Sequence, residues 1–347
     1  MSEKPELPDP TPILELGSAF AASRVLLTAI ELDLFTLLSR SPLTASEIAE
    51  KLGLHPRAVP DFPDTLLALD VITREGDGPE ARYANSELSA HYLVKGSPAY
   101  RGDFFEMCGK RLYIFWGHLT EALQTGRRQN EGHPRSGGKE LWKGIYENDE
   151  KLKGFIAAMS ANNTAAHRVF AKTFDWTNVS THLDVGGASG QLSCEVAKAN
   201  PGVRSTTFDL ERVSRIAMRN IEAQALSGKV EVMPGSFWED WKCAKVDVVT
   251  MGQILHDYSL PKKMELLKKA YEALNQGGRF VALELLIEDD RRGSVPALLM
   301  SLNMIVETGL GFDFSVKEFD VWAKKVGFTR TERLELLPPM GAVVAYK

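Results

Sequence analysis

The stretch LDVGGASGQLSCEVAKANP, which runs from Leu183 to Pro201, decides the fold of this chain. Its apolar first residues predict a buried strand, its glycines a tight turn, and its second half a helix. Such a turn lets the backbone approach a ligand closely, and the helix N-terminus directs free N–H groups at that ligand. The G-x-G-x-x-G spacing of dinucleotide sites is missing, because Ala188 stands where that motif has glycine, and no G-K-[ST] follows. The motif therefore favours a ligand other than a dinucleotide or a nucleoside triphosphate.

Short apolar segments alternate with helical stretches around this motif. The segments are THLDV, STTFDL, KVEVM, VDVVTM and RFVALELLI, and TERLELL and GAVVAYK then end the chain as a pair of strands. This alternation predicts an α/β fold with a doubly wound, mostly parallel sheet. Asp209 lies in the second segment, 19 residues after Gly190, at the sheet edge where a carboxylate can accept hydrogen bonds from ribose hydroxyls. The layout suits an adenosyl ligand without phosphates.

A helical module precedes the sheet. Residues 13–38 have apolar positions at helical spacing, TASEIAEKLG forms a short helix with a capping box of Thr44 and Glu47, and a third helix follows at 65–71. ITREGDGPEARYAN then predicts two short strands around a turn. Together these elements form a winged-helix pattern.

Charge argues against nucleic acid as a partner. The chain of 347 residues has a net charge of −5 and a pI near 5.9, whereas nucleic-acid and anionic-lipid surfaces attract basic proteins. Residues 41–95, which carry the winged-helix pattern, hold nine Asp or Glu against five Lys or Arg. Such a module would be repelled by phosphate. We therefore expect it to serve packing or dimerisation.

The sequence also indicates a cellular compartment. Three widely spaced cysteines, Cys108, Cys194 and Cys243, form no C-x-x-C pair, which indicates reduced thiols and no zinc cluster. Residues 1–12 lack the features of a secretory signal. The apolar stretches are interrupted by charge before they reach the roughly 18 residues that span a bilayer. We expect a cytoplasmic protein with no membrane partner.

Five segments in fixed order resemble a known family: LDVGGASG, FDL, PGSF, MGQILHDYS and ELLIEDD. They are similar to the class I S-adenosylmethionine-dependent small-molecule O-methyltransferases of the plant caffeate and acetylserotonin type, with their bacterial relatives. The resemblance covers nearly the whole chain. It implies S-adenosylmethionine as cofactor, S-adenosylhomocysteine as product, a homodimer, and a hydroxylated aromatic substrate of secondary metabolism.

The resemblance also implies how the chain is divided. A winged-helix dimerisation domain is expected at residues 1–100, and a Rossmann-like catalytic domain that binds the cofactor at 179–347. Between them, residues 101–178 are expected to form a helical linker that contributes to the substrate pocket.

The residues that would hold S-adenosylmethionine follow from the matched motifs. Its methionine side would lie against Asp184 and the glycine turn, its ribose against Asp209, and its adenine between Phe237 and Trp238. The expected cofactor residues are Asp184, Gly186, Gly187, Gly190, Asp209, Leu210, Gly235, Ser236, Phe237, Trp238 and Gln253.

Besides Asp313, which is described below, two positions depart from the family pattern. Ser236 stands after Gly235 where many relatives have an aspartate, and Gly252 replaces a lysine that plant members carry four residues before the histidine. A hydroxyl contact to the adenine amine is weaker than a carboxylate contact. The departures therefore imply a shifted cofactor affinity.

The segment QILHDYS supplies the candidate base. It places His256 beyond the carboxyl end of a central strand, where open α/β sheets bind their ligands. With an ordinary pKa near 6.5, a neutral imidazole there can take a proton from a hydroxyl that attacks a methyl sulfonium. Methyl transfer by this scheme needs alignment and removal of one proton. No cluster of ligands stands at metal spacing, so we predict no metal.

Three acids are candidates for support of the base. Glu284 lies in an apolar strand, where an unpaired charge is costly and a partner is expected; the resemblance implies that it orients His256. The resemblance makes Asp313, in GLGFDFSVKEF, the counterpart of a second family acid, one methylene shorter than the usual glutamate. Asp257 is interpreted as a capping or loop acid, because adjacent side chains rarely face each other.

The substrate pocket is expected to be apolar and aromatic with a few amides, which suits a flat phenolic or heteroaromatic acceptor. Its expected residues are Trp116, Met159, Asn162, Asn163, Met300, Asn303, Met304 and Phe312. Met300, Asn303 and Met304 share one helix face, which suits either a pocket wall or the protein core.

The residues leave two alternative functions open. One is an enzyme on the same scaffold that methylates nitrogen or carbon, or that uses the cofactor without methyl transfer. The other is a cofactor-sensing winged-helix regulator, which the acidic charge of the wing segment disfavours.

Overall fold

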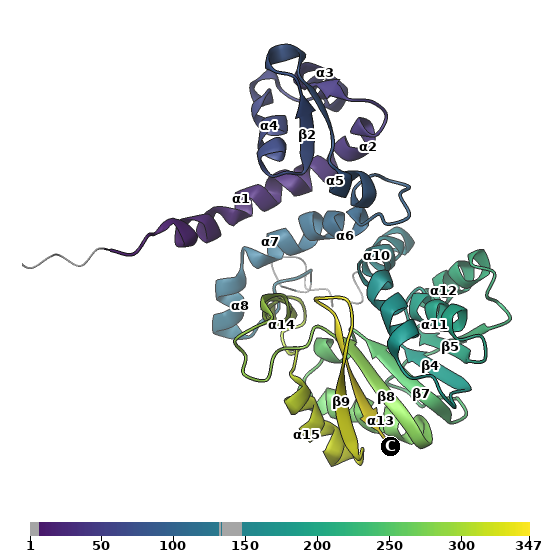
Figure 1. The fold of residues 1–347 in the computed structure, drawn as a ribbon. Coiled ribbons are helices and arrows are strands. Elements are labelled where there is room, and N and C mark those ends of the chain that lie inside the picture. Colours follow the sequence, from purple (N-terminus) through teal and green to yellow (C-terminus); the bar gives the residue numbers. More distant parts are fainter. Residues whose placement is uncertain (1–6, 132, 134–147) are drawn as a thin grey trace, which may run out of the picture. The chain divides into compact units, whose positions relative to one another are not determined.

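The computed structural model describes residues 7–131, 133 and 148–347 (Figure 1). The chain divides into two compact units, Met1–Leu112 and Tyr113–Lys347. The predicted linker at 101–178 is therefore shared between the two units, and its residues 132 and 134–147 lie outside the described residues.

The amino-terminal unit has the predicted winged-helix arrangement. Its strands form one antiparallel sheet in the order β1-β3-β2. The helical run expected at 13–38 is broken at Asp33, whose φ of 58° ends one helix and starts the next. The Thr44 and Glu47 capping box is confirmed. The elements are α1 (Thr11–Glu31), α2 (Leu34–Leu38), β1 (Leu43–Thr44), α3 (Ala45–Leu52), α4 (Asp61–Ala68), β2 (Ile72–Glu75), β3 (Arg82–Asn85), α5 (Glu87–Tyr92) and α6 (Gly102–Met107).

Helix α1 exposes a large apolar surface. Ile13, Leu14 and Leu16 are 78%, 64% and 80% exposed. By length and composition alone α1 could cross a membrane, so the expectation that every apolar stretch is too short for this is wrong for α1. Patches of exposed apolar side chains mark interaction surfaces.

The carboxy-terminal unit is the predicted α/β fold. Its helices are α7 (Tyr113–Trp116), α8 (Leu119–Thr125), α10 (Asp149–Thr173), α11 (Gln191–Ala199), α12 (Glu211–Ala223), α13 (Leu260–Ala273), α14 (Val295–Glu307) and α15 (Val316–Val326). Its strands are β4 (Thr181–Val185), β5 (Arg204–Asp209), β6 (Val230–Pro234), β7 (Val246–Gly252), β8 (Leu274–Glu284), β9 (Arg330–Glu335) and β10 (Gly341–Tyr346).

These strands form a seven-stranded sheet in the order β6-β5-β4-β7-β8-β10-β9. The strands from β4 to β8 are parallel, and β10 pairs antiparallel with both β8 and β9. The predicted terminal hairpin is confirmed, and its second strand lies inside the sheet. Right-handed crossovers between parallel strands place helices on both faces of such a sheet.

Side chains alternate between two cores along each strand. In β8, Phe280 and Ala282 pack with α13 and α15, whereas Val281 and Leu283 pack with α10 and α11 on the other face. By this alternation Glu284 points toward the α13 side, at the carboxyl end of its strand. The fold thus brings the ends of β4, β5, β6, β7 and β8 to one edge.

Candidate active site

The glycine turn after β4 has the backbone conformation that a close ligand contact requires. Gly186 and Gly190 have φ values of 73° and 70°, and Ala188 between them has a φ of 48°. Gly186 N–H donates to the carbonyl of Phe208 on β5. Ala188 therefore occupies the left-handed region that favours glycine, although it breaks the expected glycine spacing.

Gly187 covers two buried polar atoms. A Cβ at this position would lie 2.1 Å from Thr207 Oγ1 and 2.7 Å from Asp184 Oδ2. Both of those oxygens are buried and have no hydrogen-bond partner. We call the backbone of Gly186 and Gly187 the cradle. A side chain at residue 187 would collide with these two oxygens, which offer a ligand hydrogen-bonding capacity that the protein does not use.

Two carboxylates end neighbouring strands beside this turn. Asp209 accepts hydrogen bonds from the N–H groups of Ala188 at 2.9 Å and Leu210 at 2.7 Å. Asp184 Oδ1 accepts one from the Thr250 hydroxyl at 2.8 Å. Burial raises the pKa of Asp184 to about 7 and that of Asp209 to about 6. A donor-rich or cationic ligand would favour their ionised forms.

The loop after β6 presents aromatic rings at the same edge. Phe237 and Trp238 pack edge to face with ring centroids 5.2 Å apart, and Trp238 packs against Tyr258 at 4.9 Å. The Ser236 hydroxyl accepts a hydrogen bond from the Trp238 N–H at 3.3 Å. Ser236 therefore caps its own loop, a role that the sequence did not predict.

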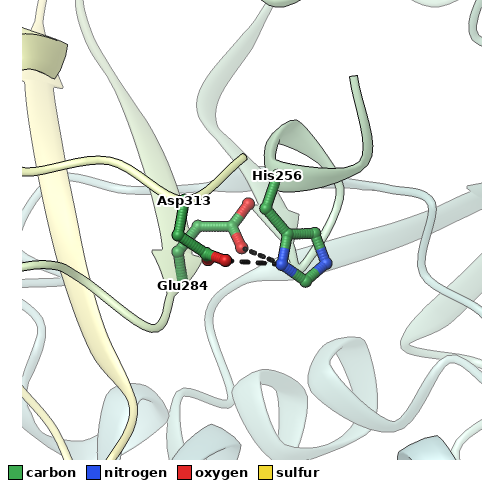
Figure 2. A group of neighbouring side chains, drawn as sticks. All are labelled: His256, Glu284 and Asp313. Carbon is green, nitrogen blue, oxygen red and sulfur yellow. Dashed lines mark hydrogen bonds and ion pairs between the residues drawn. The ribbon is translucent and has the colours of Figure 1, made fainter. Parts of the chain in front are cut away.

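His256 lies on a single 3-10 turn, η5 (Leu255–Asp257), beyond the end of β7. Its Nδ1 is 3.3 Å from Asp313 Oδ1 and 3.7 Å from Glu284 Oε2 (Figure 2). All three side chains are buried. Glu284 also accepts a hydrogen bond from the Leu255 N–H at 3.0 Å through Oε1. The carboxylate therefore holds the turn as well as the imidazole.

The acids make the imidazole strongly basic. Burial by itself lowers the pKa of His256, but the negative charges of Glu284, Asp257 and Asp313 outweigh it and raise the pKa to about 10. Burial in turn raises the pKa of Glu284 to about 7. The pKa of His256 is therefore higher than the ordinary value near 6.5 assumed from the sequence, because the fold brings three acids close to the ring.

Asp257 contacts the imidazole from the other side. Its Oδ1 is 3.6 Å from His256 Nε2, so these two adjacent side chains do approach each other, contrary to the expectation from the sequence. Burial raises the pKa of Asp257 to about 6.

The same three residues would suit a cation by spacing alone. His256, Glu284 and Asp313 each offer a ligand atom within 4.8 Å of the others. A proton on Nδ1 satisfies this geometry equally well, because an imidazolium can face two carboxylates. The prediction of a metal-independent site remains a prediction.

The predicted substrate residues lie on three helices, α7, α10 and α14, except for Phe312, which precedes α15. The Trp116 indole N–H on α7 donates to Asn303 Oδ1 on α14 at 2.8 Å, and Asn303 Nδ2 lies 3.9 Å from Met300 Sδ. Asn163 on α10 donates to Gln253 Oε1 at 2.5 Å, which joins a predicted substrate residue to a predicted cofactor residue. These contacts form one group of three residues, Trp116, Asn303 and Met300, and one pair, Asn163 and Gln253.

The remaining predicted substrate residues lie on α10, on α14 and in the segment before α15. Met159 and Asn162 lie on α10, and Met304 is 5% exposed on α14. Phe312 packs with its ring against Trp322 of the core on the α13 side, with ring centroids 6.0 Å apart. Phe312 is therefore a partly buried residue at the border of this core.

Two buried polar groups were missed by sequence reasoning. His182 on β4 lies 2.7 Å from Ser205 Oγ on β5 and 2.9 Å from Thr250 Oγ1 on β7, and Thr250 donates to Asp184. These hydrogen bonds connect side chains of β5, β4 and β7 and end at Asp184, which lies beside the glycine turn. Lys263 on α13 is fully buried beside the acids. The sequence could have indicated this burial, because Lys263 stands at a position of the amphipathic helix α13 where an apolar residue is expected.

Comparisons with known proteins agree with the resemblance. Residues 116–329 match the family model of the O-methyltransferase domain, and residues 14–95 match that of the O-methyltransferase dimerisation domain. The chain is 36% identical over 320 residues to the tetracenomycin polyketide synthesis 8-O-methyl transferase TcmO of Streptomyces glaucescens, which covers 92% of this chain and 91% of that protein.

Two further relatives extend the range of chemistry. The N,N-dimethyltransferase OxyT of Streptomyces rimosus is 32% identical over 340 residues, 96% of each chain. The crystal structure of human N-acetylserotonin methyltransferase in complex with S-adenosylmethionine superimposes with a TM-score of 0.89 at 27% identity, over 100% of this chain and 99% of that one.

Replacement of Gly187 by alanine tests the cradle. We expect Gly187→Ala to weaken S-adenosylhomocysteine binding by at least about tenfold and to lower the free energy of unfolding by about 1–3 kcal/mol, because the methyl group would collide with Thr207 and Asp184. Calorimetric titration and thermal unfolding measure both effects. Gly202→Ala is the matched control, since nothing lies within 4 Å of its Cβ. Equal affinity in the two variants would contradict the proposed cradle.

Replacement of Asp313 by asparagine tests the origin of the basic imidazole. Asp313→Asn removes one negative charge and one acceptor beside Nδ1, so the pKa of His256 should fall from its raised value. The change is measured by NMR titration of 13Cε1-labelled histidine, with His256→Gln to assign the signal. Asp240→Asn, an exposed aspartate, should leave the titration unchanged. An unaltered titration in Asp313→Asn would show that this carboxylate does not act on the ring.

Proposed function

Because this chain belongs to the O-methyltransferase family, we propose that it methylates a hydroxyl of a small aromatic or polyketide-like molecule, with His256 as general base. The protein is an enzyme that depends on S-adenosylmethionine, as its family does. The observation that carries the proposal is the buried imidazole at the carboxyl edge of the sheet, whose Nδ1 faces two carboxylates.

The residues at the ends of β4 to β7 fit the cofactor. Asp184 and the cradle of Gly186 and Gly187 would hold its methionine side, and Asp209 its ribose, while Phe237 and Trp238 would flank its adenine. The unused oxygen of Asp184 beside the cradle supports this assignment. When bound, S-adenosylmethionine supplies a methyl group on a positively charged sulfur. The remaining expected cofactor residues, Gly190, Leu210, Gly235, Ser236 and Gln253, lie in the same turns.

The acids define what His256 does with the proton. An imidazole with a pKa of about 10 matches a phenolic hydroxyl, whose pKa is also near 10, so proton transfer between them is nearly balanced. Glu284 and Asp313 stabilise the imidazolium that forms through their contacts on Nδ1. Nε2, which lies 3.6 Å from Asp257 Oδ1, is the ring nitrogen that would take the proton of the acceptor. The deprotonated ring is the active form. Turnover should therefore rise with pH toward about 10.

The class of acceptor rests on the pocket residues and on the relatives. Trp116 and Met300 each contact Asn303, and together the three residues combine an aromatic ring, a soft apolar side chain and an amide. Such a lining suits flat aromatic molecules. One relative is named for a methylation step in tetracenomycin polyketide synthesis, and another is named as an acetylserotonin O-methyltransferase. These names support an aromatic acceptor for this chain.

A second candidate is methylation of nitrogen. It is favoured by the 32% identity to the N,N-dimethyltransferase OxyT. Mass spectrometry and NMR of the product from hydroxyl and amine acceptors of one ring system would separate the two reactions. The same product analysis detects carbon methylation or a reaction without methyl transfer.

We further propose that a second copy of the chain covers the apolar face of α1. The dimerisation match includes most of this helix, and its exposed apolar side chains need a partner surface. The free thiols of Cys108, Cys194 and Cys243 support a cytoplasmic location for the homodimer.

The base assignment is tested by His256→Gln. Turnover should fall roughly 100-fold or more, since a positioned base contributes about 10²–10⁴-fold, while S-adenosylhomocysteine affinity stays unchanged. Initial rates and calorimetry measure the two effects. Assays with and without EDTA should agree, since the scheme uses no metal. His55→Gln, an exposed histidine of the other unit, is the control. Full turnover in His256→Gln would refute the base but leave the family assignment intact.

The dimer is tested by Leu16→Asp. Leu16 is 80% exposed on α1, and a charge there should weaken association and yield a monomer in size-exclusion chromatography with light scattering. Leu337→Asp, an exposed leucine of the carboxy-terminal unit, should leave the dimer intact. A dimer that persists in Leu16→Asp, or a wild-type monomer, would contradict the proposed interface.

A further inference from the structure

Helix α13 places a lysine where its amphipathic pattern calls for an apolar residue. Lys263, Leu266, Leu267 and Ala270 form the buried stripe of the helix, and the lysine side chain is 0% exposed. A buried ammonium loses its hydration and is costly unless partners replace the water. An apolar residue would fill the stripe without this cost, so the lysine has a use that packing alone does not explain.

Its partners belong to the two segments that carry the catalytic side chains. Lys263 Nζ donates to the Leu255 carbonyl at 2.8 Å and to the Phe312 carbonyl at 2.7 Å. Leu255 directly precedes His256, and Phe312 directly precedes Asp313. The ammonium also lies 3.8 Å from the centroid of the Phe312 ring. One side chain therefore joins the η5 turn to the segment before α15.

The surrounding charges keep this lysine a cation. Burial lowers the pKa of Lys263, and nearby carboxylates partly offset this effect, so that the resulting pKa is about 8. These carboxylates belong to Glu284 on β8, Asp313 before α15, Asp257 on η5 and Glu318 on α15. On α13 itself, Lys262 and Glu265 pair with each other at 2.8 Å and are about half exposed. The charged form is the one that donates to both carbonyls.

The short side chain of Asp313 makes its backbone position decisive. Aspartate has one methylene fewer than glutamate, so it reaches Nδ1 of His256 at 3.3 Å only if its own backbone lies close to the turn. The Asp313 N–H donates to Ser301 Oγ at 3.2 Å, and Lys263 holds the carbonyl just before it. These two contacts fix the peptide unit from which the carboxylate projects.

We propose that Lys263 is a positioning residue that clamps the η5 turn to the segment of Asp313 and so holds the Asp313 carboxylate on His256. The proposal rests on the role of His256 as base for its effect on turnover. Its geometric part, the dependence of the contact between Asp313 and His256 on Lys263, stands independently of that role.

A double-mutant cycle between Lys263→Met and Asp313→Asn tests the clamp. Methionine fills the buried stripe but donates to neither carbonyl. In the presence of Lys263, Asp313→Asn should lower kcat about tenfold and shift the NMR titration of His256. Lys263→Met by itself should lower kcat with little change in acceptor KM. When Asp313→Asn is added to Lys263→Met, kcat should fall less than about threefold further, and the NMR titration of His256 should stay nearly unchanged. Any constant effect of the lost charge cancels within the cycle.

Matched variants separate positioning from general destabilisation. Lys263→Arg keeps the charge and the donors and should restore part of kcat and of the coupling. Lys268→Met removes an exposed lysine of the same helix and should leave the effect of Asp313→Asn unchanged. Calorimetric binding of S-adenosylhomocysteine to each variant checks that the fold is intact. If Lys263→Met does not fold, Lys263→Gln, whose amide can still donate to one carbonyl, replaces it in the cycle.

The outcomes separate the clamp from the base. Additive effects of Lys263→Met and Asp313→Asn, in both kcat and titration, would overturn the clamp whatever the reaction is. If His256→Gln keeps full turnover, the base assignment fails, yet the titration arm of the cycle still decides whether Lys263 positions Asp313. Coupling in the titration together with coupling in kcat supports both.

Discussion

Both faces of the seven-stranded sheet are covered by helices, so polar groups that meet a ligand must stand where the parallel strands end. The cradle of glycines follows β4, Asp209 ends β5, the aromatic loop follows β6, the η5 turn follows β7 and Glu284 ends β8. Each strand thus delivers one part of the site. The period of two along the strands decides which face each side chain takes.

This placement concentrates negative charge in a dry region. Asp184, Glu284 and Asp257 all have raised pKa values because burial penalises their charged forms. The protein offsets the charge near η5 with the imidazole of His256 and the ammonium of Lys263. At the other end, near Asp184, the described residues provide hydroxyls and a neutral His182, whose pKa burial lowers to about 3. A cationic ligand would complete the charge balance at that end.

Helix α13 serves both halves of this site through two lysines. Lys263 donates to the carbonyls of Leu255 and Phe312, beside His256 and Asp313. Lys269 donates to three carbonyls of the loop after β6, those of Phe237, Trp238 and Glu239, at 3.2, 2.8 and 2.7 Å. Loop carbonyls have no partner from a sheet or helix ladder, so a side-chain donor must satisfy them. Helix α13 therefore fixes the positions of loops that are distant from one another in the sequence. Rigid support of this kind keeps catalytic groups at productive distances.

Local patterns in the sequence were enough to place the strands, the glycine turn, the capping box and the winged-helix module, because each depends on neighbours within a few residues. The motif order likewise led to His256, Glu284 and Asp313. Contacts between distant segments required the tertiary structure: the shift of the His256 pKa, the contact of Asp257, and the clamp of Lys263 on Leu255 and Phe312. Their physical reason is the same in each case, since electrostatic and hydrogen-bond energies depend on distances that only the packed sheet and helices define.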